Sequence, residues 1–161
     1  MTKRSTKRGR ITTVIIAVVL VAMVAFIVWI VSLFSVQTHW KDDLSGLTAS
    51  IAAAEEQPCS MSRGGETVEA GPAELDYFET FLTMPLTRAT GYAGKGEGDI
   101  FLILPDVTVS FAPAPDAVST CVRWEKDGRS FGYVLGGTMD YVHLERYFRN
   151  AVNNAARLAN E

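Results

Sequence analysis

The first 40 residues are dominated by one long apolar run. No residue between Arg10 and Lys41 is charged, and only two threonines and one serine are polar within residues 11–34. A helix rises about 1.5 Å per residue, so this run is long enough to cross a hydrocarbon core about 30 Å thick. Its apolar residues occur on every side of the helix, whereas a helix lying on a membrane surface has a polar face. The pattern predicts a transmembrane helix over residues 11–35.

The length of the run also bears on whether it is retained. A cleavable secretory signal has an apolar region of about 7–15 residues followed by a small-x-small site. The sequence that follows this run, VSLFSVQTHW, contains no convincing site of that kind. A retained anchor is therefore favoured over a cleaved signal and over a buried helix of a soluble protein.

Charge is distributed unevenly about the run. The chain has 15 basic and 18 acidic residues, and five of the basic ones lie in the first ten residues, which hold no acid. Ten basic and 18 acidic residues follow, a formal balance of −8. Positive flanks stay on the cytoplasmic side, so residues 1–10 are expected to be a cytoplasmic tail.

The acidic remainder of the chain is expected outside the membrane and is not expected to bind nucleic acid. We expect Arg10, Trp40 and Lys41 at the membrane interface.

Apolar residues recur at helical spacing in three further segments. One face of the first segment carries Leu44, Leu47, Ile51 and Ala54, which predicts a juxtamembrane helix or stalk over residues 36–58. This helix either continues the anchor or lies separately against the domain. Residues 72–84 begin with a proline and early acids, and residues 139–160 follow a Gly-Gly breaker; both are typical helix starts.

Four segments alternate apolar and polar residues, as strands do. They read DIFLIL, VTVSFA, AVSTCVRWE and SFGYVLGG, and the dipeptides PD and DG mark tight turns within the two pairs. The DG turn predicts that Trp124 faces Phe131 across the second hairpin, with Cys121 and Arg123 on the opposite face. The sequence therefore predicts an α+β domain over residues 59–161, with a four-stranded antiparallel sheet covered by helices.

No complete catalytic, cofactor or metal motif occurs. The glycine-rich TRATGYAGKGEGD lacks the Ser/Thr and the following helix that a P-loop needs, and indicates a surface loop. Two cysteines without clustered histidines do not make a metal site. In an oxidising compartment Cys59 and Cys121 are expected to form a disulfide, with free thiols as the alternative. Cys121 and His143 would be a nucleophilic pair only with Cys121 reduced and the two in one cleft. No catalytic, cofactor-binding or metal residue is assigned.

These features favour a single-pass protein of a bacterial cell envelope that binds other envelope proteins as an accessory or assembly subunit. The arrangement superficially resembles membrane-anchored NTF2-like proteins of secretion and transport systems, from which the long final helix departs. The alternative is an anchored sensor or carrier with a small-molecule or lipid pocket between the helix at 72–84 and the sheet. Tyr77, Phe78 and Phe81 would line that pocket. An envelope enzyme is less favoured.

Overall fold

The computed structural model describes residues 4–137 and 140–159. The chain divides into two compact units, Met1–Ser35 and Val36–Glu161. The helix α1 (Arg4–Ala53) contributes to both units, and the fold class is α+β, as the sequence predicts. The antiparallel sheet has seven strands, so the expected count of four is wrong.

The apolar run forms the part of α1 that belongs to the first unit. Most large side chains from Val14 to Phe34 are more than half exposed, because no other part of this unit covers them. From Thr13 onward the helix is long and apolar enough to cross a membrane. A helix satisfies its own backbone hydrogen bonds, which is what a chain needs in lipid. The run therefore fits the expected single-pass membrane anchor.

The described residues of the second unit form one sheet and two further helices, besides the end of α1. The strands lie in the order β2-β1-β4-β5-β6-β7-β3, and every neighbouring pair is antiparallel. The bounds of the elements are β1 (Cys59–Arg63), β2 (Glu66–Ala70), α2 (Pro72–Thr83), β3 (Arg88–Tyr92), β4 (Ile100–Ile103), β5 (Thr108–Pro113), β6 (Thr120–Lys126), β7 (Arg129–Gly136) and α3 (Tyr141–Leu158).

The four predicted strands correspond to β4–β7, and the predicted register of the second hairpin is confirmed. Trp124 pairs with Phe131. The turn residues Asp127 and Gly128 have φ angles of 53° and 72°, which are the left-handed angles that a type I′ turn requires. The hairpin β1–β2 and the strand β3 were not predicted. Gly64 and Gly65 make the same kind of left-handed turn between β1 and β2.

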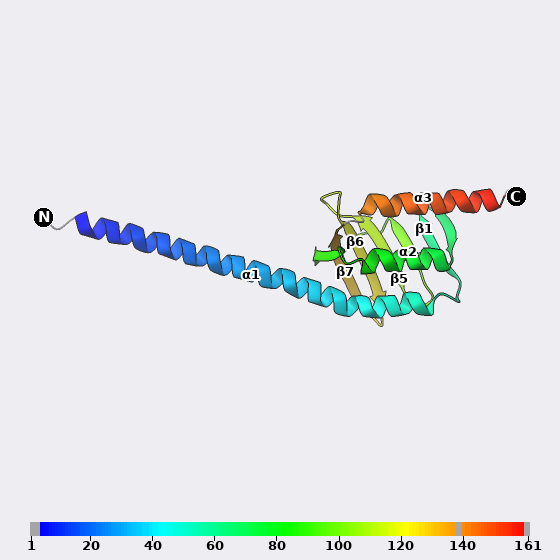
Figure 1. Ribbon diagram of the computed structural model, residues 1–161, viewed down its shortest axis with the longest axis horizontal. Coiled ribbons are helices and arrows are strands. Elements are labelled where there is room, and N and C mark those ends of the chain that lie inside the picture. The colour runs from blue at the N-terminus through cyan, green and yellow to red at the C-terminus, as the bar shows by residue number, and fades with distance from the viewer. Residues whose placement is uncertain (1–3, 138–139, 160–161) are drawn as a thin grey trace. The chain divides into compact units, whose positions relative to one another are not determined.

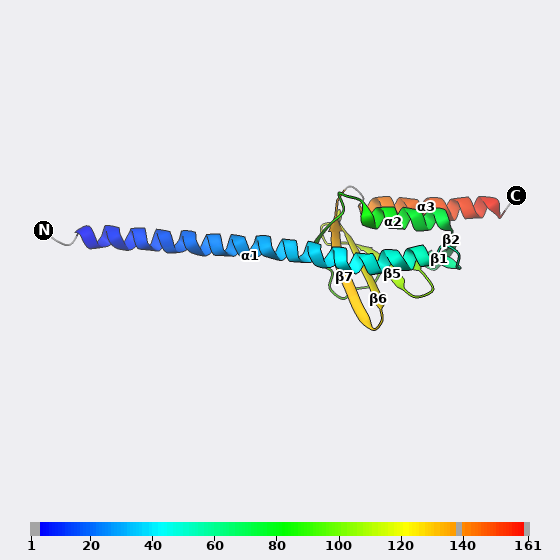
Figure 2. The ribbon, with the colours of Figure 1, turned by 60° about the horizontal axis from the view of Figure 1, so that its bottom comes forward.

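All three helices pack on one face of the sheet, called here the covered face. One buried cluster joins side chains of α2, α3 and the end of α1 to alternate side chains of every strand. Figure 1 and Figure 2 show these helices over the strands of the domain. Within the cluster, Phe78 and Phe81 of α2 contact Phe111 of β5 at ring-centroid distances of 5.3 and 6.0 Å. Aromatic side chains thus fill the space in which the sequence placed a ligand pocket.

The end of α1 is held to the sheet by polar contacts as well as by apolar packing. The side-chain oxygen of Gln37 accepts a hydrogen bond from the backbone N–H of Ala89, at the edge strand β3, over 2.8 Å. Thirteen residues later along the helix, Ser50 donates to Asp106 in the β4–β5 turn over 2.9 Å. Residues 36–53 are therefore part of the domain rather than a stalk before it.

Trp40 does not have the environment of an interfacial anchor. Its side chain is 1% exposed, and its ring lies 5.2 Å from that of Tyr133 and 6.2 Å from that of Trp124. Both contacts are edge-on, which is a favourable arrangement for aromatic pairs. The expectation of Trp40 at the membrane interface is therefore wrong, because the indole ring is buried in the core of the domain.

The expected disulfide is not present either. Cys59 and Cys121 are both buried free thiols. The strands that carry them, β1 and β6, are separated by β4 and β5. Three strand spacings amount to about 14 Å, whereas the Cα atoms of a disulfide lie within about 7 Å of each other. The two thiols also belong to separate buried clusters on opposite faces of the sheet.

Replacing Trp40 by alanine should lower the free energy of unfolding by about 3–5 kcal/mol, as expected for loss of a large buried aromatic ring. Denaturant unfolding of the full-length protein in detergent, followed by circular dichroism, measures this change. The matched control is His39→Ala, because His39 is the exposed neighbour on the same helix. Equal stability of the two variants would show that Trp40 is not a core residue.

Candidate functional site

The sheet has a second face that α1, α2 and α3 do not cover, called here the open face. It carries the side chains that alternate with the core residues of β4–β7, among them Phe101, Ile103, Thr108, Ser110 and Arg123. Most of these side chains are only partly buried. A sheet face without a covering layer is available for binding.

The connection from β3 to β4, residues 93–99, crosses the open face and is called here the crossing loop. It must pass β7, β6 and β5, because β3 is an edge strand and β4 lies beyond these three. Its contacts follow that path. The N–H of Ala93 donates to Gly132 of β7, the carbonyl of Gly94 accepts from Arg123 of β6, and the N–H of Asp99 donates to Phe111 of β5.

Glycine lets the crossing loop lie close against the sheet. A Cβ atom on Gly98 would come within 2.6 Å of Cβ of Ser110, and one on Gly96 within 3.0 Å of Nη2 of Arg123. On the strand side, a Cβ atom on Gly132 would come within 2.7 Å of the carbonyl oxygen of Ala93. Among the glycines of this loop, Gly98 is therefore required by its close approach to the sheet, whereas Gly94 is not.

Arg123 lies beneath the crossing loop. Its Nε donates to the carbonyl of Gly94 over 2.7 Å, which fixes the orientation of the guanidinium. Its Nη1 is buried and has no hydrogen-bond partner in the part of the chain that the structure describes. A buried donor left without a partner costs about 1–3 kcal/mol, and more when the group is charged. Such a group is uncommon in a folded domain unless something else satisfies it.

A cavity of about 490 Å³ opens beside this arginine. Its lining combines the crossing loop with the open face, including Lys95, Phe101, Thr108, Arg123 and Glu125. This volume is within the range of about 300–1,000 Å³ typical of small-molecule sites. The two cations and one carboxylate make its lining positive, although the chain beyond the anchor is acidic.

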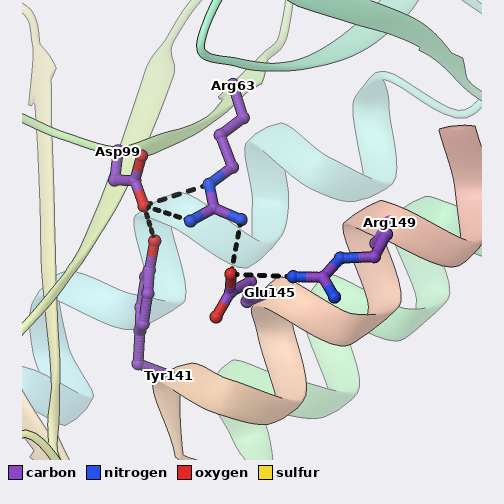
Figure 3. Close-up of polar contacts among 5 residues, drawn as sticks. All are labelled: Arg63, Asp99, Tyr141, Glu145 and Arg149. Atoms are coloured by element: carbon purple, nitrogen blue, oxygen red, sulfur yellow. Dashed lines mark hydrogen bonds and ion pairs between the residues drawn. The ribbon is translucent and has the colours of Figure 1, made fainter.

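A second polar cluster surrounds Arg63 of β1 (Figure 3). Arg63 forms ion pairs at 2.9 Å with Asp99, at the end of the crossing loop, and with Glu145 of α3. Arg149 pairs with the same oxygen of Glu145 at 3.1 Å, and the hydroxyl of Tyr141 donates to Asp99. The charges of this cluster are therefore matched internally, and it joins the crossing loop to α3 and β1.

The cluster shifts the pKa values of its members. Burial would raise the pKa of Asp99, but the hydrogen bonds from Arg63 and Tyr141 outweigh it and lower that pKa. Burial raises the pKa of Tyr141, and its hydrogen bond to Asp99 raises it further. The hydrogen bond to Asp99 raises the pKa of Arg63. Arg63 and Asp99 therefore stay charged and Tyr141 stays neutral near pH 7, so none of these three groups is ready to exchange a proton.

The residues singled out from the sequence do not assemble into a site. Cys121 lies on the open face, whereas α3, which carries the exposed His143, packs on the covered face. Lys41 is exposed, and the side chain of Arg10 lies outside the described residues. Within residues 4–137 and 140–159, no three His, Cys, Asp or Glu side chains gather as metal ligands would.

Sequence reasoning missed the importance of Arg123 and Arg63. The predicted hairpin register did place Arg123 opposite the core face, and an arginine at the centre of a strand was an available signal. Its position beneath the crossing loop depends on the strand order, which no local pattern records. No helix or strand was predicted for the segment that carries Arg63, so its contacts with Asp99 and Glu145 were not anticipated.

No family model matches this chain, and no curated protein or solved structure matches it. Its function is therefore inferred from the geometry of the domain and the character of the anchor.

Replacing Gly98 by alanine should destabilise the protein by about 1–3 kcal/mol, because the added methyl group overpacks the contact with Ser110. The matched control is Gly94→Ala, since nothing lies within 4 Å of a Cβ atom at Gly94. Denaturant unfolding of both full-length variants measures the difference. Equal stability would show that the crossing loop does not lie close to the sheet.

The lowered pKa of Asp99 predicts a dependence of stability on pH. An Asp with a lowered folded-state pKa stabilises the protein above its unfolded-state pKa of about 3.9, and this contribution disappears as pH falls through the folded-state pKa. Asp99→Asn should therefore lower stability at pH 7 and reduce the loss of stability on acidification below about pH 4. Unfolding curves of wild type and variant at several pH values test this, with the more exposed Asp76→Asn as control. An unchanged pH profile in Asp99→Asn would contradict the assignment.

Proposed function

We propose that this chain is a single-pass envelope protein whose extracytoplasmic domain binds another protein through the open face, as an accessory or assembly subunit. The observation that carries the proposal is the one-sided construction of the domain. Three helices pack on the covered face, while the open face is crossed by one glycine-rich loop. An antiparallel sheet in a two-layer domain can keep one face in solvent, and that face is accessible to a partner.

The character of the anchor supports a partner at the same membrane. The apolar run ends at Phe34, and the first core residue of the domain, Val36, follows two positions later. A domain that follows a span this closely in the sequence is tethered to the membrane by a very short connection. The basic tail and acidic remainder favour an N-terminus inside and a domain outside the cytoplasm.

The second candidate function is small-molecule binding by an anchored sensor or carrier. The pocket expected between α2 and the sheet is occupied by Phe78, Phe81 and Phe111, so that location gives it no support. The cavity beside Arg123 on the open face supports it instead. An enzymatic function is not proposed, because Cys121 and His143 lie on different sides of the sheet and the Arg63 cluster is internally paired.

Site-specific photo-crosslinking in the native membrane tests the binding role. A photoreactive amino acid is placed on the open face at Ile103 or Thr108, and on exposed helix positions at Thr80 of α2 or Asn154 of α3. We expect a cross-linked species of discrete mass from the two open-face positions and none from the two helix positions.

All four positions are at least partly exposed, so the comparison controls for reactivity and for folding. Cross-links from Thr80 or Asn154 in the absence of any from Ile103 and Thr108 would assign binding to the helical layer. Absence of a discrete cross-link from both open-face positions would also overturn the proposal.

A further inference from the structure

We propose that the cavity on the open face binds a carboxylate group, held by the guanidinium of Arg123 beneath the crossing loop. This inference deepens the proposed function and rests on it, since it assigns a chemistry to the open face as a binding surface. The ligand is a small carboxylic acid or the terminal carboxylate of a partner chain.

The first ground is the state of Arg123. Its Nε is used by Gly94, so the guanidinium is fixed in orientation. Its Nη1 is buried without a hydrogen-bond partner, and within residues 4–137 and 140–159 no carboxylate pairs with it. Arg123 also lines the cavity, so a carboxylate there would meet a guanidinium of fixed orientation that has no internal counter-charge. Such a guanidinium is suited to bind a carboxylate through charge-assisted hydrogen bonds.

The contrast with Arg63 shows what is unusual here. Arg63 is also partly buried, but it is matched by two carboxylates, Asp99 and Glu145. A smaller cavity of about 310 Å³ beside Arg63 and Arg149 therefore has no unmatched charge to offer an anion, since Glu145 pairs with both arginines. Arg123, on the open face, has no carboxylate partner among the described residues.

The second ground is the lining of the cavity. Lys95 of the crossing loop adds a second cation, and the hydroxyl groups of Thr108, Ser110 and Ser130 provide further polar contacts. Phe101 supplies an apolar wall for the body of a ligand. One carboxylate, Glu125, also lines the cavity. Glu125 and Lys95 are both exposed, so solvent screens both charges, and the partly buried Arg123 contributes most to the attraction of an anion. An acid with an apolar body fits this combination.

Titration of the full-length protein in detergent with 4-fluorobenzoate, observed by fluorine NMR, tests the inference. Its neutral counterpart, 4-fluorobenzamide, has nearly the same shape and apolar surface but no charge. We expect the acid to bind at least about tenfold more tightly than the amide, which is the effect of a charge-assisted hydrogen bond. Arg123→Gln should abolish this preference, whereas Arg88→Gln, an exposed arginine outside the cavity, should retain it.

A second variant keeps the test decisive if Arg123→Gln does not fold. Lys95 is exposed on the crossing loop, so Lys95→Gln should leave the fold intact and weaken binding of the acid about two- to fivefold. Equal affinity for acid and amide would overturn the inference. So would a preference that survives Arg123→Gln, or an unchanged affinity in Lys95→Gln.

A peptide arm distinguishes the two sources of the carboxylate. A short acetylated peptide with a free C-terminus is compared with its amidated form and with 4-fluorobenzoate. Tighter binding of the free peptide than of the benzoate identifies the end of a partner chain as the ligand, and the reverse order identifies a small acid. Cross-linking and carboxylate preference are separate readouts, so the carboxylate site can fail while the protein partner is retained, and the reverse.

Discussion

The packing of one stretch of helix, residues 36–53 of α1, against the sheet is the contact on which the domain depends. Over residues 11–34 the helix is apolar on all sides, as a membrane span requires; from Val36 onward, buried apolar residues lie on one side only. That side buries Trp40 against Trp124 and Tyr133, and Gln37 satisfies the amide of Ala89 on an edge strand. The last part of α1 thus belongs to the domain, and the domain core is incomplete without it.

Because α1, α2 and α3 all pack on the covered face, no helix covers the open face. The strand order then forces the link between β3 and β4 to cross that face, since three strands separate them. At Gly98 the loop comes so close to the sheet that a Cβ atom would clash with Ser110. The crossing loop covers Arg123 and accepts a hydrogen bond from its Nε at the carbonyl of Gly94. Its Nη1 has no partner among the described residues. The candidate site therefore follows from topology, and glycine makes it sterically feasible.

Local patterns in the sequence predicted the parts of the fold that local physics determines. The Asp127-Gly128 turn fixed a register, and that register placed Arg123 away from the core. The Gly64-Gly65 turn carried the same signal, but the short flanking strands are largely polar. Strand β3 was missed because it is short and contains a register shift between Ala89 and Gly91. Trp40 and the cysteines were misjudged because burial and strand separation depend on contacts distant in sequence.

The most direct test of the central claim compares two truncated chains, one comprising residues 36–161 and the other residues 59–161. The first retains the stretch of α1 that completes the core, and the second begins at β1. We expect residues 36–161 to fold cooperatively in water, with the circular dichroism of an α+β domain, and residues 59–161 not to fold. Equal folding and equal unfolding free energies of the two chains would show that α1 is not part of the core.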